Sequence, residues 1–381
     1  MASNDDLLDA ISSVLPPILN ALDVLNEVGR HLHPPNLGSL NDAVAERVGP
    51  VRDGLVRFRE TEFPEHFSGF KDCVERAGEH VVAAFEGLAA AAGDPNGPMR
   101  AYRAMREQTR AVEALYPVAN MLPPVSRFFL SRGRRGDDDL LARLGDADAS
   151  RDEVGVMHAS ADEWAQMRGT DVEATGDSRR GGFSLYVPEY YEEARAHPMI
   201  VALHGGSGNG RDFLWTWLVE ARTRGAILLS PSSVDRTWSL MGTDLDSANL
   251  AAMVTRISQR WNIDHDKLLL TGMSDGGTFC YVSGLRPDSP FTHLAPSSAS
   301  FHPMLLEGTS RERLAGLPIY LMHGVLDWMF PVDVARTANA ALSAAGAKVV
   351  YREIEDLSHT WPRDENPRIV DWFLGEASAG G

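Results

Sequence analysis

The sequence predicts two regions of different class: an N-terminal all-helical domain, then an α/β domain whose mostly parallel sheet has helices on both faces. Three observations predict this division. Apolar residues recur at helical spacing in the first third of the chain, short apolar runs alternate with helical windows after Gly182, and a charged, weakly patterned segment separates the two. We therefore expect a helical bundle over residues 1–131, a linker and lead-in over 132–180, and an α/β domain over 181–378.

Four amphipathic stripes define the helical region. Prolines and glycines interrupt the pattern at 31–38 and 93–98, so we expect four helices packed as an up-and-down bundle. Pro16 and Pro17 lie within the first stripe and predict a helix start or a kink there. The stripes are Ile11, Leu15, Ile18, Leu22 and Leu25; Val44, Val48, Val51, Leu55 and Phe58; Phe67, Phe70, Val74, Ala77, Val81, Ala84 and Leu88; and Tyr102, Met105, Thr109, Val112 and Tyr116.

Six short runs of apolar and β-branched residues are candidate strands of the α/β region. Apolar strands that alternate with helices predict a mostly parallel sheet covered on both faces. Such sheets bind ligands at the carboxyl ends of their strands, so the residues just after each strand are the first candidates for a site. The strands are Phe183–Val187, Met199–His204, Ala226–Ser230, Lys267–Met273, Pro318–His323 and Lys348–Ile354.

Composition excludes several classes of function. Of the 381 residues 44% are apolar and 23% charged, which rules out disorder as the main state, and the net charge of −17 disfavours nucleic acid and anionic membranes as partners. No apolar stretch approaches twenty residues without a charge, so we expect no membrane span, and acids near the N-terminus argue against a signal peptide and for a cytoplasmic protein. Cys73 and Cys280 form no paired motif, and His31 with His33 lacks a third ligand, so we expect no disulfide and no metal.

A nucleophile motif follows the strand Lys267–Met273. Gly272-Met273-Ser274-Asp275-Gly276 reads G-x-S-x-G, with a strand before it and a helical window after it. This sharp turn needs small neighbours and lifts the serine hydroxyl above the sheet edge. The sequence therefore predicts Ser274 as a nucleophile.

An acid and a base follow later strands in the order that this class of sheet uses. Asp327 lies in the loop after Pro318–His323, and His359 lies in the loop after Lys348–Ile354. A serine hydroxyl needs a base to take its proton, so we predict a Ser274–Asp327–His359 triad. Asp356 is the rival acid and ranks lower, because it shares the loop of His359.

The loop after Met199–Leu203 predicts an oxyanion hole. His204-Gly205-Gly206-Ser207-Gly208 lets backbone approach a ligand closely, so we expect the amides of Gly206 and Asp275 to meet the oxyanion. We expect His204 and His323, which precede glycines, to shape their loops. A phosphate cradle is the alternative for this loop, but neither the dinucleotide nor the P-loop pattern is complete.

Residues from about 180 to 375 resemble the phospholipase/carboxylesterase, feruloyl esterase and polyhydroxyalkanoate depolymerase branch of the α/β-hydrolase superfamily. The resemblance rests on LHGGSGNG (203–210), WNIDHDKLLLTGMSDGG (261–277), HGVLDWMFP (323–331) and SHTWP (358–362). It implies Ser274 as nucleophile, Asp327 as acid, His359 as base, and an oxyanion hole from the amides of Gly206 and Asp275. It departs from secreted members in lacking paired cysteines.

The sequence thus predicts a cofactor-free serine hydrolase acting on a small-molecule or oligomeric ester, with Trp238, Trp328 and Trp361 near strand ends as candidates for a substrate pocket. A peptidase, amidase or thioesterase could use the same triad, and a partner-binding protein dominated by its helical half is the alternative from another class. Little room for a helical lid remains between about 286 and 317, where four prolines lie. We therefore expect part of residues 1–130 to cover the Ser274 mouth, with a homodimer interface as the alternative role.

Overall fold

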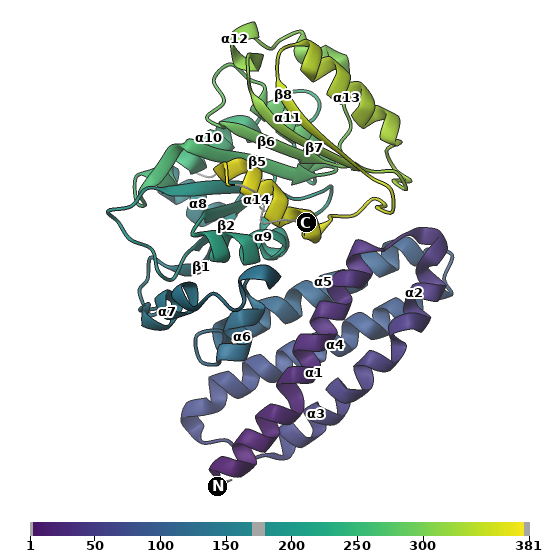
Figure 1. The fold of residues 1–381 in the computed structure, drawn as a ribbon, viewed down its shortest axis with the longest axis vertical. Coiled ribbons are helices and arrows are strands. Elements are labelled where there is room, and N and C mark those ends of the chain that lie inside the picture. Colours follow the sequence, from purple (N-terminus) through teal and green to yellow (C-terminus); the bar gives the residue numbers. More distant parts are fainter. Residues whose placement is uncertain (1–2, 170–179, 377–381) are drawn as a thin grey trace. The chain divides into compact units, whose positions relative to one another are not determined.

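The computed structural model describes residues 3–169 and 180–376, and the chain divides into two compact units between Asp137 and Asp138. The first unit is helical and the second is built on one sheet (Figure 1). The division falls six residues beyond the predicted end of the bundle, within the charged block SRGRRGDDD. Each unit has its own buried apolar residues, as the two textures of the sequence predict.

The long helices of the first unit run side by side as a bundle (Figure 1). All four predicted stripes are helical, although the second begins at the end of a short additional helix, α2, that the stripes did not predict. Most of the apolar positions of the stripes are buried inside the bundle, and this burial stabilises the helices. The helices are α1 (Asn4–Arg30), α2 (Leu37–Val44), α3 (Gly49–Glu60), α4 (Ser68–Ala92), α5 (Gly97–Leu115) and the shorter α6 (Pro123–Phe128).

Helix α1 continues through Pro16 and Pro17, where the sequence predicted a start or a kink. Pro17 has no N–H to donate to the carbonyl of Ser13. Gly54 of α3 lies directly against that carbonyl: a Cβ on Gly54 would be 2.4 Å from the Ser13 oxygen. The close approach of α1 and α3 therefore depends on glycine at position 54, and it covers the backbone that the proline leaves without its helical donor.

Among the described residues, α1 is also the one helix long and apolar enough to cross a membrane by length and composition. The sequence predicted no membrane span. In the bundle, however, Val14, Ile18 and Leu22 are fully buried along one stripe of this helix. The buried core helix of a bundle can be as long and as apolar as a membrane-spanning helix. Length and hydropathy therefore do not distinguish these two classes for α1.

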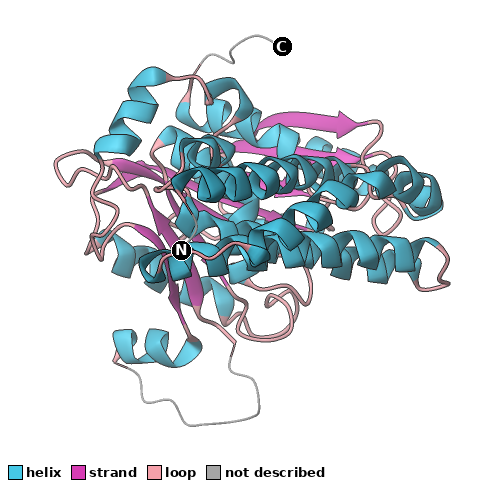
Figure 2. Cartoon of the chain, turned by 90° about the horizontal axis from the view of Figure 1, so that it is seen from below, coloured by secondary structure: helices cyan, strands magenta, loops and turns pink. Residues whose placement is uncertain are grey.

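The second unit contains an eight-stranded sheet in the order β1-β2-β4-β3-β5-β6-β7-β8, magenta in Figure 2. Strands β4, β3, β5, β6, β7 and β8 are parallel, and β1 and β2 add an antiparallel edge. The prediction of a mostly parallel sheet is confirmed. The strands are β1 (Gly155–Ala159), β2 (Phe183–Val187), β3 (His197–Leu203), β4 (Ile227–Pro231), β5 (Ile263–Met273), β6 (His293–Ser297), β7 (Pro318–Gly324) and β8 (Lys348–Ile354).

Helices alternate with the parallel strands of this unit, as the sequence predicted. The longer ones are α9 (Gly210–Arg224), α10 (Asp246–Ser258), α11 (Asp275–Gly284), α13 (Val332–Ala344) and α14 (Asn366–Leu374). The central strand β3 is fully buried from Met199 to Leu203, which explains its uninterrupted apolar run.

Two strands were missed, and the predicted linker and lead-in over 132–180 is corrected over part of its length, while 170–179 lie outside the described residues. Residues 138–168 belong to the second unit, where they form α7 (Asp138–Asp146), β1 and α8 (Ala161–Arg168). Strand β1 is an edge strand with little buried surface, so its alternation is weak in the sequence. Strand β6 escaped detection because it is short and contains Pro296, a residue that weakens a strand prediction.

Candidate active site

The turn between β5 and α11 holds Ser274 in a strained backbone conformation, with φ 55° and ψ −120°. Non-glycine residues rarely adopt such angles, and they persist where the surrounding structure enforces them. Two glycines allow the turn to close: a Cβ on Gly272 would be 2.6 Å from Gly276, and one on Gly276 would be 2.5 Å from the carbonyls of Leu203 and His204. The small residues of the G-x-S-x-G pattern are therefore a steric requirement of this turn.

The structure brings Ser274, His359 and Asp327 together from three separate loops. His359 Nε2 lies 3.0 Å from Ser274 Oγ, and His359 Nδ1 lies 2.8 Å from Asp327 Oδ2. A carboxylate only accepts hydrogen bonds, so Nδ1 carries the proton and Nε2 is left to accept from the serine hydroxyl. All three side chains are buried. The acid on Nδ1 is Asp327, the predicted residue, rather than the rival Asp356.

The other oxygen of Asp327 is held by backbone. The N–H groups of Met329 and Phe330 each donate to Oδ1 at 2.9 Å, which leaves Oδ2 for His359. Burial by itself raises the pKa of this carboxyl, but the hydrogen bond and charge of His359 and the Phe330 amide lower it below its ordinary value. The acid is therefore ionised and oriented before any substrate arrives.

The loop after β3 lies against the nucleophile turn, as predicted for an oxyanion hole. A Cβ on Gly205 would be 3.6 Å from the Ser274 Cβ, and one on Gly206 would be 2.6 Å from the Asp275 carboxylate. Within the described part of the chain, the amides of Gly206 and Asp275 donate to no protein acceptor. Both N–H groups are thus available to a ligand, and their role in binding an oxyanion stays a prediction.

Trp238 supports this loop and does not line an open pocket, which corrects one expectation. It is only 2% exposed, its indole N–H donates to the His204 carbonyl at 2.7 Å, and its ring stacks on Phe279 at 5.3 Å. The His204 ring in turn faces the Gly205 carbonyl through Nδ1, at 2.7 Å, and accepts the Ser233 N–H through Nε2. Burial lowers the pKa of His204 to about 4, so the ring is neutral near pH 7.

Asp246 organises the segment that carries Trp238, a role that sequence reasoning missed. This carboxylate is buried at the start of α10 and accepts the N–H of Val234 through one oxygen and the N–H and hydroxyl of Ser239 through the other, each at 2.8 Å. An acid before a helical window is common in sequences, so no signal distinguished it. Its hydrogen bonds fix the two ends of the loop that supports His204.

The other two predicted pocket tryptophans differ in exposure. Trp361 is buried against Phe213 and Trp217, with its N–H on Asn366 Oδ1 at 2.8 Å, so it also packs inside the unit. Trp328, next to the acid, is 46% exposed. Of the three candidates, Trp328 is by far the most exposed, and its part in a substrate pocket stays a prediction.

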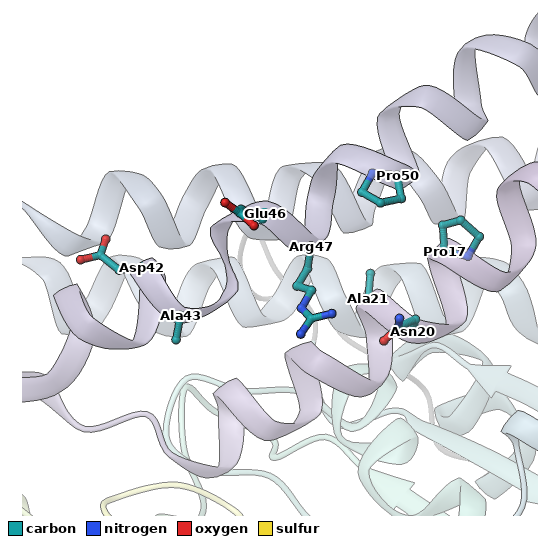
Figure 3. A pocket seen from close by; sticks show the side chains of 8 residues that line it. All are labelled: Pro17, Asn20, Ala21, Asp42, Ala43, Glu46, Arg47 and Pro50. Atoms are coloured by element: carbon teal, nitrogen blue, oxygen red, sulfur yellow. The ribbon is translucent and has the colours of Figure 1, made fainter.

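A hollow of about 380 Å³ lies in the helical unit among α1, α2 and the start of α3 (Figure 3). Its lining mixes carboxylates, a guanidinium, an amide and prolines, which together define no single ligand chemistry. Among the residues that the structure describes, no three His, Cys, Asp or Glu side chains are grouped to hold a metal. The lining residues are Pro17, Asn20, Ala21, Asp42, Ala43, Glu46, Arg47 and Pro50.

The sheet and the strained serine turn define the class of the second unit. A mostly parallel sheet, with a strained serine turn after β5 and with an aspartate and a histidine after β7 and β8, is the architecture of the α/β-hydrolase fold. No family model matches the chain.

Two relatives are similar over part of the chain. A feruloyl esterase C of Emericella nidulans is 26% identical over 176 residues, which are 44% of this chain and 62% of the relative. A bifunctional acetylxylan esterase/xylanase of Neocallimastix patriciarum is 24% identical over 193 residues, 48% of this chain and 26% of the relative. The chain thus spans less than two thirds of the length of either. Among solved structures, a thermostable esterase has a TM-score of 0.46 and 18% identity, over 58% of this chain and 62% of that chain.

Proposed function

We propose that the α/β unit is a serine hydrolase that cleaves a carboxylic ester through an acyl-enzyme on Ser274. The observation that carries the proposal is the continuous hydrogen-bonded line from Ser274 Oγ to His359 and on to Asp327, at 3.0 and 2.8 Å. The strained turn supports it, because strain of this kind concentrates at functional sites.

In the proposed reaction, Ser274 Oγ attacks the ester carbonyl carbon while His359 Nε2 takes the hydroxyl proton. Asp327 stabilises the imidazolium that forms, and the amides of Gly206 and Asp275 donate to the oxyanion. The intermediate collapses when His359 returns the proton to the leaving alcohol. Water then attacks the acyl-enzyme with His359 as base again, which releases the carboxylic acid and restores the serine.

The loops at the carboxyl edge of the sheet favour an ester with apolar groups. Large apolar side chains are exposed in the segments after β4, β6 and β7, on the edge that carries Ser274. Exposed apolar side chains grouped near a site are typical of surfaces that bind apolar ligands. The names of both relatives support an ester as substrate. The exposed residues are Val234, Met241, Leu245, Met304, Leu326, Trp328 and Met329.

Labelling with a fluorophosphonate probe tests the proposal directly. We expect the intact protein to be labelled at Ser274, and Ser274→Ala to lose the label while its circular dichroism is unchanged. Ser283→Ala, which changes a buried serine of the same helix, is the matched control and should label normally. A label on Ser207, or a label that persists in Ser274→Ala, would overturn the assignment.

Matched substrates then separate the reaction classes. One acyl group presented as an ester, a thioester and an anilide compares the three leaving groups at constant acyl chemistry. We expect the ester to give the highest kcat/KM, rising with acyl length if the exposed apolar residues contact the substrate. For the helical unit, the expected role as a cover over the site and the alternative role as a homodimer interface both stay predictions.

A further inference from the structure

The imidazole of His323 lies at the carboxyl end of β7, beneath the loop that carries Asp327, and is not one of the three triad residues. It is fully buried, and its Nε2 lies 2.9 Å from the Phe330 carbonyl oxygen. A carbonyl oxygen only accepts, so Nε2 carries the proton. Nδ1 has no hydrogen-bond partner in the described part of the chain. The one hydrogen bond of this ring in the described part of the chain is therefore the one that it donates to the Phe330 carbonyl.

Phe330 contacts His323 and also both members of the acid–base pair, Asp327 and His359. Its N–H donates to Asp327 Oδ1 at 2.9 Å, and its carbonyl accepts from His323. Its ring lies edge-on against the His359 imidazole, with the centroids 5.5 Å apart. One residue thus receives the His323 hydrogen bond, donates to the acid and contacts the base.

We infer that His323 is a positioning residue for the hydrolysis: by holding Phe330, it keeps the Asp327 carboxylate in line with His359. The inference rests on the proposed function, since it concerns the same triad. His323 contacts Phe330 and Asp327 and forms no hydrogen bond with Ser274. The sequence signal was the His-Gly at a strand end, which predicted only that this ring shapes its loop.

The charge state of the ring fits this role. The charged and titratable groups that face His323 are Asp327 on its own loop, His359 on the loop after β8, and Glu353 on β8 itself. Burial lowers the pKa of His323, which outweighs the opposing effects of Phe330 and the two acids, so the ring is neutral. Its Nε2 is 3.4 Å from Asp327 Oδ2. A neutral donor can hold the acid loop without neutralising the negative charge that His359 requires.

Two amide substitutions, each of which retains an N–H near one nitrogen of the imidazole, test the inference. Glutamine carries an N–H near the place of Nε2, whereas asparagine carries one near the place of Nδ1. We expect His323→Asn to lower kcat on a p-nitrophenyl ester by about 10- to 100-fold with little change in KM, and His323→Gln to remain within roughly threefold of wild type. The acidic limb of the pH–rate profile should move to lower pH in His323→Asn, because the imidazolium of His359 then faces a misaligned carboxylate.

A histidine elsewhere supplies the control. His197 is buried at the amino end of β3, with Nδ1 2.8 Å from the Gly225 carbonyl. His197→Asn should lower the midpoint of thermal unfolding but leave the pH–rate profile in place, with rates normalised to the folded fraction from circular dichroism. Equal activity of the two His323 variants, or a fall in kcat with an unmoved acidic limb, would refute the inference.

Nitrogen-15 NMR of the wild-type protein keeps the test decisive if His323→Asn does not fold. The signal that disappears in His323→Gln identifies His323, and we expect a neutral ring protonated on Nε2. The Nδ1-protonated tautomer would refute the inference, because Nε2 could not donate to Phe330. A wild-type protein that takes no fluorophosphonate at Ser274 would instead refute the proposed function.

Discussion

The two units differ in where they hold strained backbone. In the α/β unit three serines have positive φ, namely Ser207, Ser274 and Ser298, and each follows the carboxyl end of a strand. In the helical unit no described residue other than glycine has positive φ. Such conformations each cost about 1–3 kcal/mol and survive only where packing enforces them. The strained non-glycine residues of the described chain therefore lie at the edge of the sheet that carries the candidate triad, and not in the bundle.

One ion pair from each unit shows a contrast in burial. Arg52–Glu86 in the bundle joins two exposed side chains, and pairs of this kind contribute little. Arg222–Glu189 in the α/β unit is fully buried, and the Tyr186 hydroxyl also donates to Glu189. Removal of one buried partner would leave an uncompensated charge, at about 3–5 kcal/mol. Loss of Arg222 or Glu189 should accordingly cost far more than loss of Arg52 or Glu86.

The largest expected effect comes from the strained serine. Ser274→Ala should lower kcat on a p-nitrophenyl ester by roughly 10³-fold or more, because the residues of a triad act as a unit. Ser274→Gly should be equally inactive but more stable than Ser274→Ala by about 1 kcal/mol, since glycine adopts positive φ without strain. Urea unfolding of the two variants measures the difference. Equal stability would mean that the turn stores no strain.

Loss of the acid should be nearly as severe. Asp327→Asn should reduce kcat by about 10³- to 10⁴-fold, because the amide disfavours the tautomer that leaves Nε2 free to accept. Asp356→Asn, on the same loop as His359, is the matched control and should change kcat by less than about threefold. The prediction fails if Asp356 is the more sensitive position. Steady-state kinetics at saturating substrate decide it.

We expect acid to lower the stability of the α/β unit, because a buried histidine of this unit resists protonation in the folded state. The pKa of His204 is lowered by burial from 6.5 to about 4. Below pH 6.5 the His204 ring is protonated in the unfolded chain, but in the folded protein it stays neutral down to about pH 4. The free energy of unfolding therefore falls between pH 6.5 and about pH 4, and this contribution is constant at lower pH. The contribution is roughly 2–4 kcal/mol.

Tryptophan fluorescence can measure this decline in the α/β unit alone, because all eight tryptophans lie between residues 164 and 372. Urea midpoints should fall from pH 7 to pH 4. Burial also lowers the pKa of His293, at the amino end of β6, to about 4. His293→Gln should flatten part of the slope without altering kcat at pH 7. A midpoint that stays constant or rises would contradict the pH assignment.

The smallest expected effect belongs to the bundle. Gly54→Ala should destabilise it by about 1–3 kcal/mol, because the new methyl group meets the backbone of α1. Gly69→Ala in α4, whose Cβ would meet nothing within 4 Å, is the matched control and should be neutral or stabilising. Helical circular dichroism should report the loss with kcat unchanged. Equal midpoints for the two variants would show that α1 shifts freely.

Periodicity predicted the elements whose apolar residues face a core on a regular repeat. It found the four bundle stripes and the six strands, but not β1 and β6, where an edge position and Pro296 removed the signal. It also placed Ser274, Asp327 and His359 after the correct strands, since parallel strands bring their carboxyl ends to one edge. Trp238 shows the limit: proximity to a strand end in sequence did not reveal that its ring is buried beneath the loop.

The sequence by itself determined the order of the units, the parallel sheet and the identity of the candidate triad, because each depends on local pattern and on which strand a residue follows. The tertiary structure alone decided which groups hold that triad and the loop after β3 in place. His323, Phe330 and Asp246 act through hydrogen bonds to backbone N–H and C=O groups. Every residue except proline carries both groups, so such contacts leave no mark in the amino-acid sequence and exist only once the loops have folded.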